Sequence, residues 1–210
     1  MKIEYQTGFA IDKPVDAVVN SANGFLLLGK SGAGRIRDVA DKLNIFNWVE
    51  YGCYLLSLPK KTRMWFVNAY KNHNWKLSKA QLSSMRLLLE NNKQPFLLGS
   101  VVMDKDKING KTVIHAVGMS YDLDKNKERI PATEDSVNEC MKNVIKIISV
   151  LGVDSIAIPV MCARKGYGLS PEKSLKIIES SLKEISDSKL KVTICFDNEE
   201  TERYLQQINA

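Results

Sequence analysis

The feature that most constrains the fold is the alternation of strand-length apolar runs with helix-period segments along 210 residues. Three of the runs are close to continuously apolar, at 15–19 (VDAVV), 155–160 (SIAIPV) and 191–196 (KVTICF). Strands that are apolar on both faces are typical of a sheet covered by helices on both sides. The alternation therefore predicts an α/β fold with a central, largely parallel or mixed sheet between helix layers.

Local start and stop signals place the elements along the chain. Thr133 and Gly152 bracket an amphipathic segment, and Ser170-Pro171 provides an N-cap followed by proline at the first helical position. We expect helices at 34–43, 78–91, 133–151, from 170 onward, and at 199–208. We expect strands at 2–6, 15–22, 64–70, 95–103, 112–119, 155–160 and 191–196, and a charged surface loop at 122–129.

Composition narrows the class of protein. Hydrophobic residues make up 44% and charged residues 26%, which is ordinary for a globular chain. No apolar run approaches the roughly 18 residues of a membrane helix, and the first residues lack a signal-peptide core, so we expect a cytoplasmic protein without membrane contact. Four dispersed cysteines and two histidines make a zinc site improbable, and no metal is expected. The net charge of +6 favours anionic ligands, but lysine is scattered along the whole chain, so solubility is the stronger explanation of the charge.

Residues 15–37 join an expected strand to a glycine-rich loop and then to a helix. Glycines allow backbone N–H groups to approach a ligand closely, and a helix start adds positive partial charge, which together suit a phosphate. An asparagine amide suits a ribose hydroxyl or a bound water. A tight turn of purely structural use would give the same spacing. The polar and glycine positions concerned are Asn20, Asn23, Gly24, Gly29, Gly32 and Gly34.

Residues 155–171 form a second unit of strand, loop and helix. The strand ends near Val160, and the loop carries Arg164 and Lys165 before the helix start at Ser170. Ligands of open α/β sheets bind beyond the carboxyl ends of the strands, so both loops are candidate ligand sites. Arginine can hold a phosphate through two hydrogen bonds, whereas lysine acts as a point charge. The alternative is a solvated basic loop.

Together these segments resemble the macrodomain family. VDAVVNSAN at 15–23 is similar to the family's D-A-I-V-N-A-A-N, TVIHAVG at 112–118 to its I-H-A-V-G strand, and SIAIPV at 155–160 to its S-I-A-F-P-A strand. KVTICFD at 191–197 and the closing helix also fit. The resemblance covers about 1–37 and 96–208 and fades between 38 and 95. We interpret 38–95 as an insertion in a single domain spanning 1–210.

The resemblance implies a three-layer α/β/α macrodomain-like fold with a central mixed sheet, and a cleft for ADP-ribose or a related ADP-ribosyl nucleotide. By position, Asn23 would contact the distal ribose, the loop at 24–33 would wrap the diphosphate, and the loop at 161–167 would close over the phosphates. Phe196 and Asn198 would flank the adenine, and Val18 and Ala22 would line the cleft. The ligand-binding residues predicted in this way are Phe9, Val18, Ala22, Asn23, Gly29, Lys30, Ser31, Gly32, Ala33, Cys162, Ala163, Arg164, Lys165, Gly166, Tyr167, Phe196 and Asn198.

Three positions depart from the family pattern. The aspartate that accepts from the adenine amino group is missing at Gly8-Phe9-Ala10, where Phe9 would stack on a base instead. The catalytic aspartate of the ester-cleaving branch corresponds to Ala33, which leaves Asn23 and Lys30 as the catalytic candidates. Cys162-Ala163-Arg164 replaces the usual serine-threonine-glycine of the phosphate loop, and a cation thus stands where a glycine is usual.

Three functions follow from these observations. The leading hypothesis is a module that binds ADP-ribose or a related nucleotide, without a cofactor. The alternative is an ADP-ribosyl hydrolase acting on ADP-ribosylated protein, nucleic acid or O-acetyl-ADP-ribose. A second alternative is a nucleic-acid or poly-ADP-ribose binder, based on the positive charge and on the mixed aromatic and basic segment 70–76 (YKNHNWK).

Overall fold

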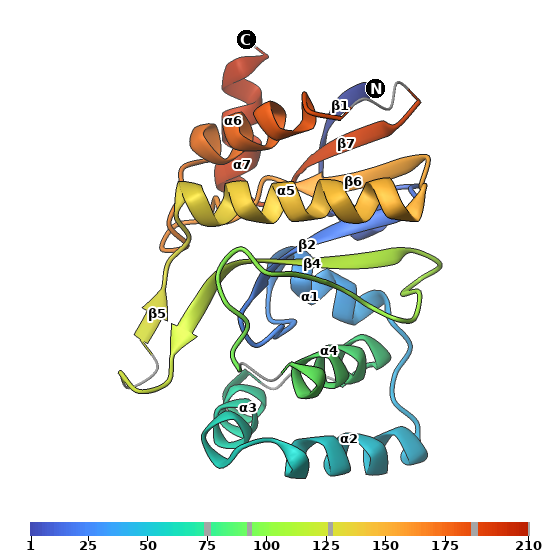
Figure 1. Ribbon diagram of the computed structural model, residues 1–210, viewed down its shortest axis with the longest axis vertical. Helices are drawn as coiled ribbons and strands as arrows, with labels where there is room; N and C mark the ends of the chain where they lie inside the picture. Colours follow the sequence, from blue (N-terminus) through green and yellow to red (C-terminus); the bar gives the residue numbers. More distant parts are fainter. Residues whose placement is uncertain (74–76, 92–93, 126–127, 186–188, 210) are drawn as a thin grey trace.

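The computed structural model describes residues 1–73, 77–91, 94–125, 128–185 and 189–209, and its centre is a mixed sheet (Figure 1). The strand order is β1-β7-β6-β2-β4-β3. The first five strands in this order are parallel to one another, and the last, β3, is antiparallel to β4. Strand β5 pairs with the end of β4 as a hairpin. The expected mixed sheet is confirmed. Its strands are β1 (Lys2–Thr7), β2 (Ala17–Asn23), β3 (Val101–Met103), β4 (Thr112–Asp122), β5 (Glu128–Ile130), β6 (Ser155–Pro159) and β7 (Lys191–Phe196).

Helices cover both faces of the sheet. One face packs on α5 (Glu134–Leu151), α6 (Pro171–Leu182) and α7 (Glu199–Ile208). The other packs on η1 (Ala10–Asp12), α1 (Ser31–Val39) and the start of α4 (Lys79–Glu90). Successive strand residues point to opposite faces, so Val19 belongs to the first core and Val18 to the second. The three-layer arrangement expected from the apolar runs is confirmed.

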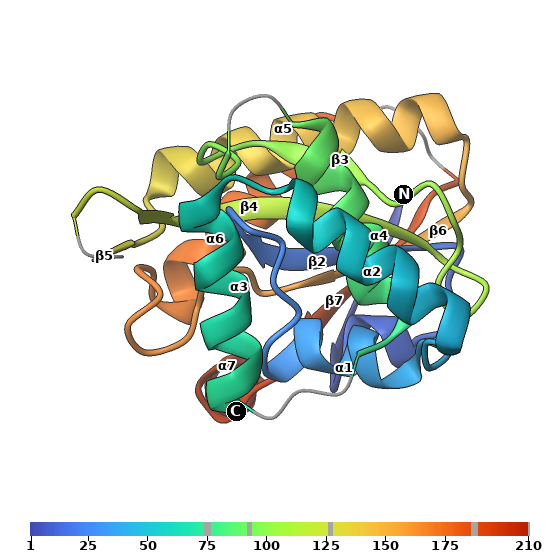
Figure 2. The same ribbon diagram turned by 90° about the horizontal axis from the view of Figure 1, so that it is seen from below.

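Residues 45–90 build a helical extension from α2 (Ile45–Ser57), α3 (Lys60–His73) and α4. It has a core of its own, in which Trp65 of α3 stacks on Phe25 of the loop after β2 with ring centroids 4.3 Å apart. Figure 2 shows α3 running past that loop. The extension lies within the segment interpreted as an insertion, and it places α3 beside the end of the sheet where the β2 loop emerges.

The strand expected at 64–70 is wrong, because these residues belong to α3. Trp65, Phe66, Ala69 and Tyr70 contact the helical core, whereas Met64 and Val67 are exposed. That spacing is helical, and a short apolar run cannot by itself distinguish a buried strand from a helix.

Other predicted element boundaries differ less from those in the structure. The helix expected at 34–43 begins earlier, at Ser31, and the strand expected at 95–103 is reduced to Val101–Met103. The expected loop at 122–129 is partly the β4–β5 hairpin, and its residues 126–127 lie outside the described residues. Thr133, Ser170 and Gly152 cap their helices as predicted. Among the described helices, none combines the length and apolar character needed to cross a membrane.

Candidate functional site

The loops that follow β2, β6 and β7 meet at one edge of the sheet and enclose a small cavity of about 70 Å³, here called the cleft. Strands β2, β6 and β7 are mutually parallel, so their carboxyl ends lie at this edge, as the general rule for open α/β sheets requires. Predicted ligand-binding residues lie together in its lining: Lys30, Ser31, Gly32, Ala33, Cys162, Ala163, Arg164, Tyr167 and Asn198.

Arg164 bridges the two loops. Its Nη1 donates a hydrogen bond of 2.8 Å to Oγ of Ser31 at the start of α1. Lys30, the exposed N-cap residue of α1, lies beside this contact and lines the cleft as well. Two cations and the N-terminus of a helix therefore converge on one small volume, and each favours an anion.

Asp197 is a cleft residue that the sequence analysis did not select. Burial raises the pKa of its carboxyl group, while hydrogen bonds from Asn198 and from the Gly32 backbone act in the opposite direction. A Cβ on Gly32 would lie 2.8 Å from Oδ2 of Asp197, so a larger residue here would displace this carboxylate. The residue directly follows β7, and the strand-end rule applied to the other two loops would also have identified it.

A larger groove of about 600 Å³ adjoins the cleft. Lys30, Ala33, Arg164 and Tyr167 line both, and the groove continues along α3 past Trp65. Four cations line it, and its described lining contains no aspartate or glutamate: the cations are Lys30, Arg129, Arg164 and Lys165. Sequence analysis did not select Arg129, which was assigned to a surface loop, or Trp65, Asn68 and Ala69, which were assigned to a strand.

The amide of Asn23, which also lines the groove, is largely used by its own loop. Its Oδ1 accepts from Phe25 N–H at 3.0 Å and from Leu27 N–H at 3.3 Å, and its Nδ2 donates to the Leu27 carbonyl at 3.0 Å. These bonds shape the loop between β2 and α1, and leave one N–H of the amide for a ligand.

Cys162 is buried at the turn after β6 in a left-handed backbone conformation, with φ of 56°. Its N–H donates to Oγ of Ser21 at 3.2 Å, and its Sγ lies 3.6 Å from the same oxygen. Burial raises the pKa of the Cys162 thiol to about 11. A thiol that stays protonated at neutral pH is a poor nucleophile, so the geometry favours a packing role for this side chain.

The structure places some predicted residues elsewhere. Ala22, Gly29 and Lys165 join Asn23 in the groove, but Phe9, Val18, Gly166 and Phe196 lie outside the lining of both cavities. Phe196 is fully buried in the core under α5, α6 and α7, and Val18 is fully buried on the opposite face of the sheet. The expectation that these two residues line the ligand site is corrected by their complete burial in the two cores of the sheet.

The expected aromatic and basic segment at 70–76 is only partly described. Its first residues belong to α3, where Tyr70 packs in the helical core and Asn72 lines the groove. Residues 74–76, including Trp75 and Lys76, lie outside the described residues. Across the described chain, no three His, Cys, Asp or Glu side chains gather in a group that could hold a metal ion.

Comparison with known proteins identifies the fold. A model of the Macro domain family matches residues 71–178. No curated protein matches the sequence. Among solved structures, the macrodomain of Thermus aquaticus DarG aligns with a TM-score of 0.55 and 17% identity, covering 93% of this chain and 98% of that one. An Oceanobacillus iheyensis macrodomain with ADP aligns at 0.58 and 16%, covering 99% and 90%. A Trypanosoma brucei macrodomain in complex with ADP-ribose aligns at 0.59 and 19%, covering 99% and 69%.

Proposed function

The chain belongs to the macrodomain family, and we propose that it binds ADP-ribose or a related ADP-ribosyl nucleotide in the cleft. The observation that carries this proposal is the hydrogen bond from Arg164 to Ser31, which brings a cation of the β6 loop against the N-terminus of α1. Lys30 and the Gly32 backbone stand at the same place. This constellation suits a diphosphate, which would replace Ser31 as the partner of Arg164.

The small volume of the cleft bears on how the nucleotide enters. About 70 Å³ is far below the roughly 300 Å³ at which small-molecule sites begin, whereas the adjoining groove has about 600 Å³. Arg164 lies between the two and is exposed, so its side chain is free to swing away from Ser31. We therefore expect ADP-ribose to span both cavities once this hydrogen bond opens.

Isothermal titration calorimetry with ADP-ribose tests the proposal. We expect micromolar binding in the wild type, and weakening of about tenfold or more in Arg164→Ala, because a charge-assisted contact contributes about 1.5–3 kcal/mol. Arg203→Ala is the matched control, since Arg203 is an exposed arginine of α7 outside both cavity linings, and it should bind as the wild type does. Absence of binding by the wild type at millimolar ligand would refute the assignment.

A second candidate function is removal of ADP-ribose from an anionic acceptor such as nucleic acid. It is favoured by the groove, whose described lining has four cations and no carboxylate, together with the aromatic residues Trp65, Tyr121 and Tyr167. Lys30 lines both cavities, so its ammonium group lies beside any ligand that spans them. Asn23 remains the other catalytic candidate.

Turnover of ADP-ribosylated oligonucleotide and ADP-ribosylated protein separates this candidate from a pure binder. We expect oligonucleotide turnover that is lost in Lys30→Ala, while that variant still binds ADP-ribose. Affinity for the oligonucleotide should fall steeply with salt if the groove holds its phosphates. Binding of ADP-ribose without turnover of either substrate would leave the chain a binding module.

A further inference from the structure

A chain of four polar side chains runs from the cleft to α4 through the interior of the protein. Oγ of Ser83 donates to Oδ1 of Asp104 at 2.5 Å, and Oδ2 of Asp104 lies 3.1 Å from Nε2 of His115. Nδ1 of His115 lies 3.0 Å from Nδ2 of Asn20, which lines the cleft. None of the four residues is more than 6% exposed.

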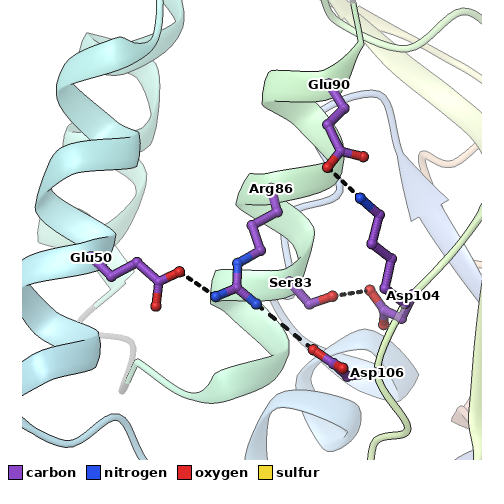
Figure 3. A network of polar contacts seen from close by, with 7 residues as sticks. Glu50, Ser83, Arg86, Glu90, Asp104 and Asp106 are labelled. Carbon is purple, nitrogen blue, oxygen red and sulfur yellow. Dashed lines mark hydrogen bonds and ion pairs between the residues drawn. The ribbon is translucent and has the colours of Figure 1, made fainter.

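Figure 3 shows the outer end of this chain, where Ser83 of α4 points to Asp104. Around it, Arg86 joins Glu50 of α2 to Asp106, and Lys105 reaches Glu90. These ion pairs link the segment after β3 to α4 and α2. Asp104 is buried in that segment and contacts both Ser83 and His115.

The tautomer of His115 sets the direction of each hydrogen bond. With hydrogen on Nε2, the imidazole donates to Asp104, which also accepts from the Ser83 hydroxyl. Nδ1 of that imidazole then carries a lone pair and accepts from the Nδ2–H of Asn20. With the amide nitrogen turned toward His115, the amide oxygen is the atom left for the cleft.

That oxygen has no hydrogen-bond partner within the described chain, although Asn20 is only 3% exposed. Among the described residues, the polar side-chain atoms that are both inaccessible to solvent and without a hydrogen-bond partner belong to Ser78, Gln81, Ser84 and Gln94. Oδ1 of Asn20 therefore opens onto the cavity. A buried acceptor left without a partner is costly unless a ligand or water satisfies it, so this atom marks a ligand contact.

We propose that Asn20 contacts the bound nucleotide through Oδ1, and that His115 and Asp104 are positioning residues that hold its amide as an acceptor. The cleft then selects a ligand that presents an N–H or O–H donor, from either the 6-amino group of adenine or a ribose hydroxyl. The inference rests on the proposed nucleotide binding and deepens it.

The orientation is tested on the wild-type protein without ligand, by the ¹⁵N chemical shifts of the His115 ring. The chain has two histidines, so a His73→Gln variant leaves one set of signals to assign. We expect the neutral tautomer with hydrogen on Nε2 and a bare Nδ1. A proton on Nδ1 would turn the Asn20 amide round, present a donor to the cleft, and overturn the proposal.

Ligand contact is tested by calorimetry with ADP-ribose and two analogues, inosine diphosphate ribose, which lacks the 6-amino group, and ADP-ribose lacking the adenosine 2′-hydroxyl. We expect the wild type to prefer ADP-ribose over one analogue by about 3–10-fold, and Asn20→Ala to lose that preference. The analogue that binds more weakly identifies the ligand group that donates to Asn20. Ser84→Ala is the control, because Ser84 is also buried and polar but lies outside the cleft. This variant should retain the preference for ADP-ribose.

The positioning role has its own readout. Asp104→Asn keeps an acceptor for His115 and should retain the preference, whereas His115→Phe removes the bond to Asn20 and should lose it. If the latter variant or Asn20→Ala does not fold, the wild-type side-chain amide signal of Asn20 decides, because contact predicts that it shifts on addition of ADP-ribose. Unchanged preference in a folded Asn20→Ala, or an unmoved amide signal, overturns this inference alone. Absence of any binding overturns the proposed function with it.

Discussion

At the scale of single residues, the cleft is framed by strained backbone. Ser31 and Cys162 have φ of 55° and 56°, in the left-handed region that non-glycine residues rarely adopt. Each makes a hydrogen bond to another element, since Arg164 of the β6 loop donates to Ser31 and the Cys162 N–H donates to Ser21 of β2. Strain of about 1–3 kcal/mol per residue persists where surrounding contacts determine the conformation, and it is concentrated at binding sites.

Gly118 allows the Cys162 turn to pack against β4. A Cβ at Gly118 would lie 2.3 Å from Sγ of Cys162, which is itself buried. We expect Gly118→Ala to lower the free energy of unfolding by about 1–3 kcal/mol through overpacking. Urea denaturation measures the change.

The matched control for Gly118→Ala is the same substitution in a Cys162→Ala background, where the sulfur is gone. The cost of Gly118→Ala should largely disappear there, and a double-mutant cycle gives the coupling between the two sites. An equal cost in both backgrounds would show that Cys162 is not what limits space at Gly118.

At the scale of elements, Asn198 is both a cleft residue and the N-cap of α7. Its Oδ1 accepts from the N–H groups of Glu200 and Thr201, each at 3.2 Å. We expect Asn198→Ala to cost about 1 kcal/mol of stability and Asn198→Ser to cost less, because serine also caps a helix. Thermal unfolding measures both. Asn138→Ala, within α5, is the control and should cost little, since alanine favours the helix interior.

The elements also show how far local pattern predicts structure. Helix α5 follows its signals closely, from Thr133 as N-cap to Gly152 in a left-handed conformation. Helix α3 does not, because 64–70 is a short apolar run whose type was decided by packing on Phe25 and α4. Capping residues act on their immediate neighbours and are visible in sequence, whereas the partner of an apolar face is not.

At the scale of the whole molecule, buried thiols and phenols set the response to alkali. Burial raises the pKa of Cys140 and Cys195 to about 12, of Cys162 to about 11, and of Tyr51 to about 12. The unfolded chain releases these protons nearer their ordinary values, so it binds fewer protons than the native state at high pH. Stability is therefore full below pH 9 and falls as pH rises toward 12.

Urea denaturation at pH 7, 9 and 10.5 measures this decline. Cys140→Ala should lessen it between pH 9 and 10.5, because one buried ionisable group is removed. Cys53→Ala is the control, since that thiol is exposed, and its pH profile should follow the wild type. A stability that is unchanged to pH 10.5 would contradict the burial of the three other cysteines.

The sequence by itself determined the layers and the loops of the site. Apolar runs and the strand-end rule place the loops that carry Lys30, Ser31 and Arg164 near one edge of the sheet, because these signals are local or topological. Asn198 was predicted from the family resemblance alone. The prediction of a nucleotide site from the resemblance also needed no coordinates.

Only the tertiary structure decided what that edge can recognise. Arg164 and Ser31 are 133 residues apart in the sequence, and Asn20 and His115 are 95 residues apart. No local sequence pattern predicts either contact. Alternation along a strand predicts which residues share a face of the sheet. It does not predict that Phe196 is buried under α6 and α7 while Asp197 lines the cleft. The Asn20 amide at the floor of the cleft is oriented by its contact with His115, which in turn contacts Asp104, and only the folded chain brings these three side chains together.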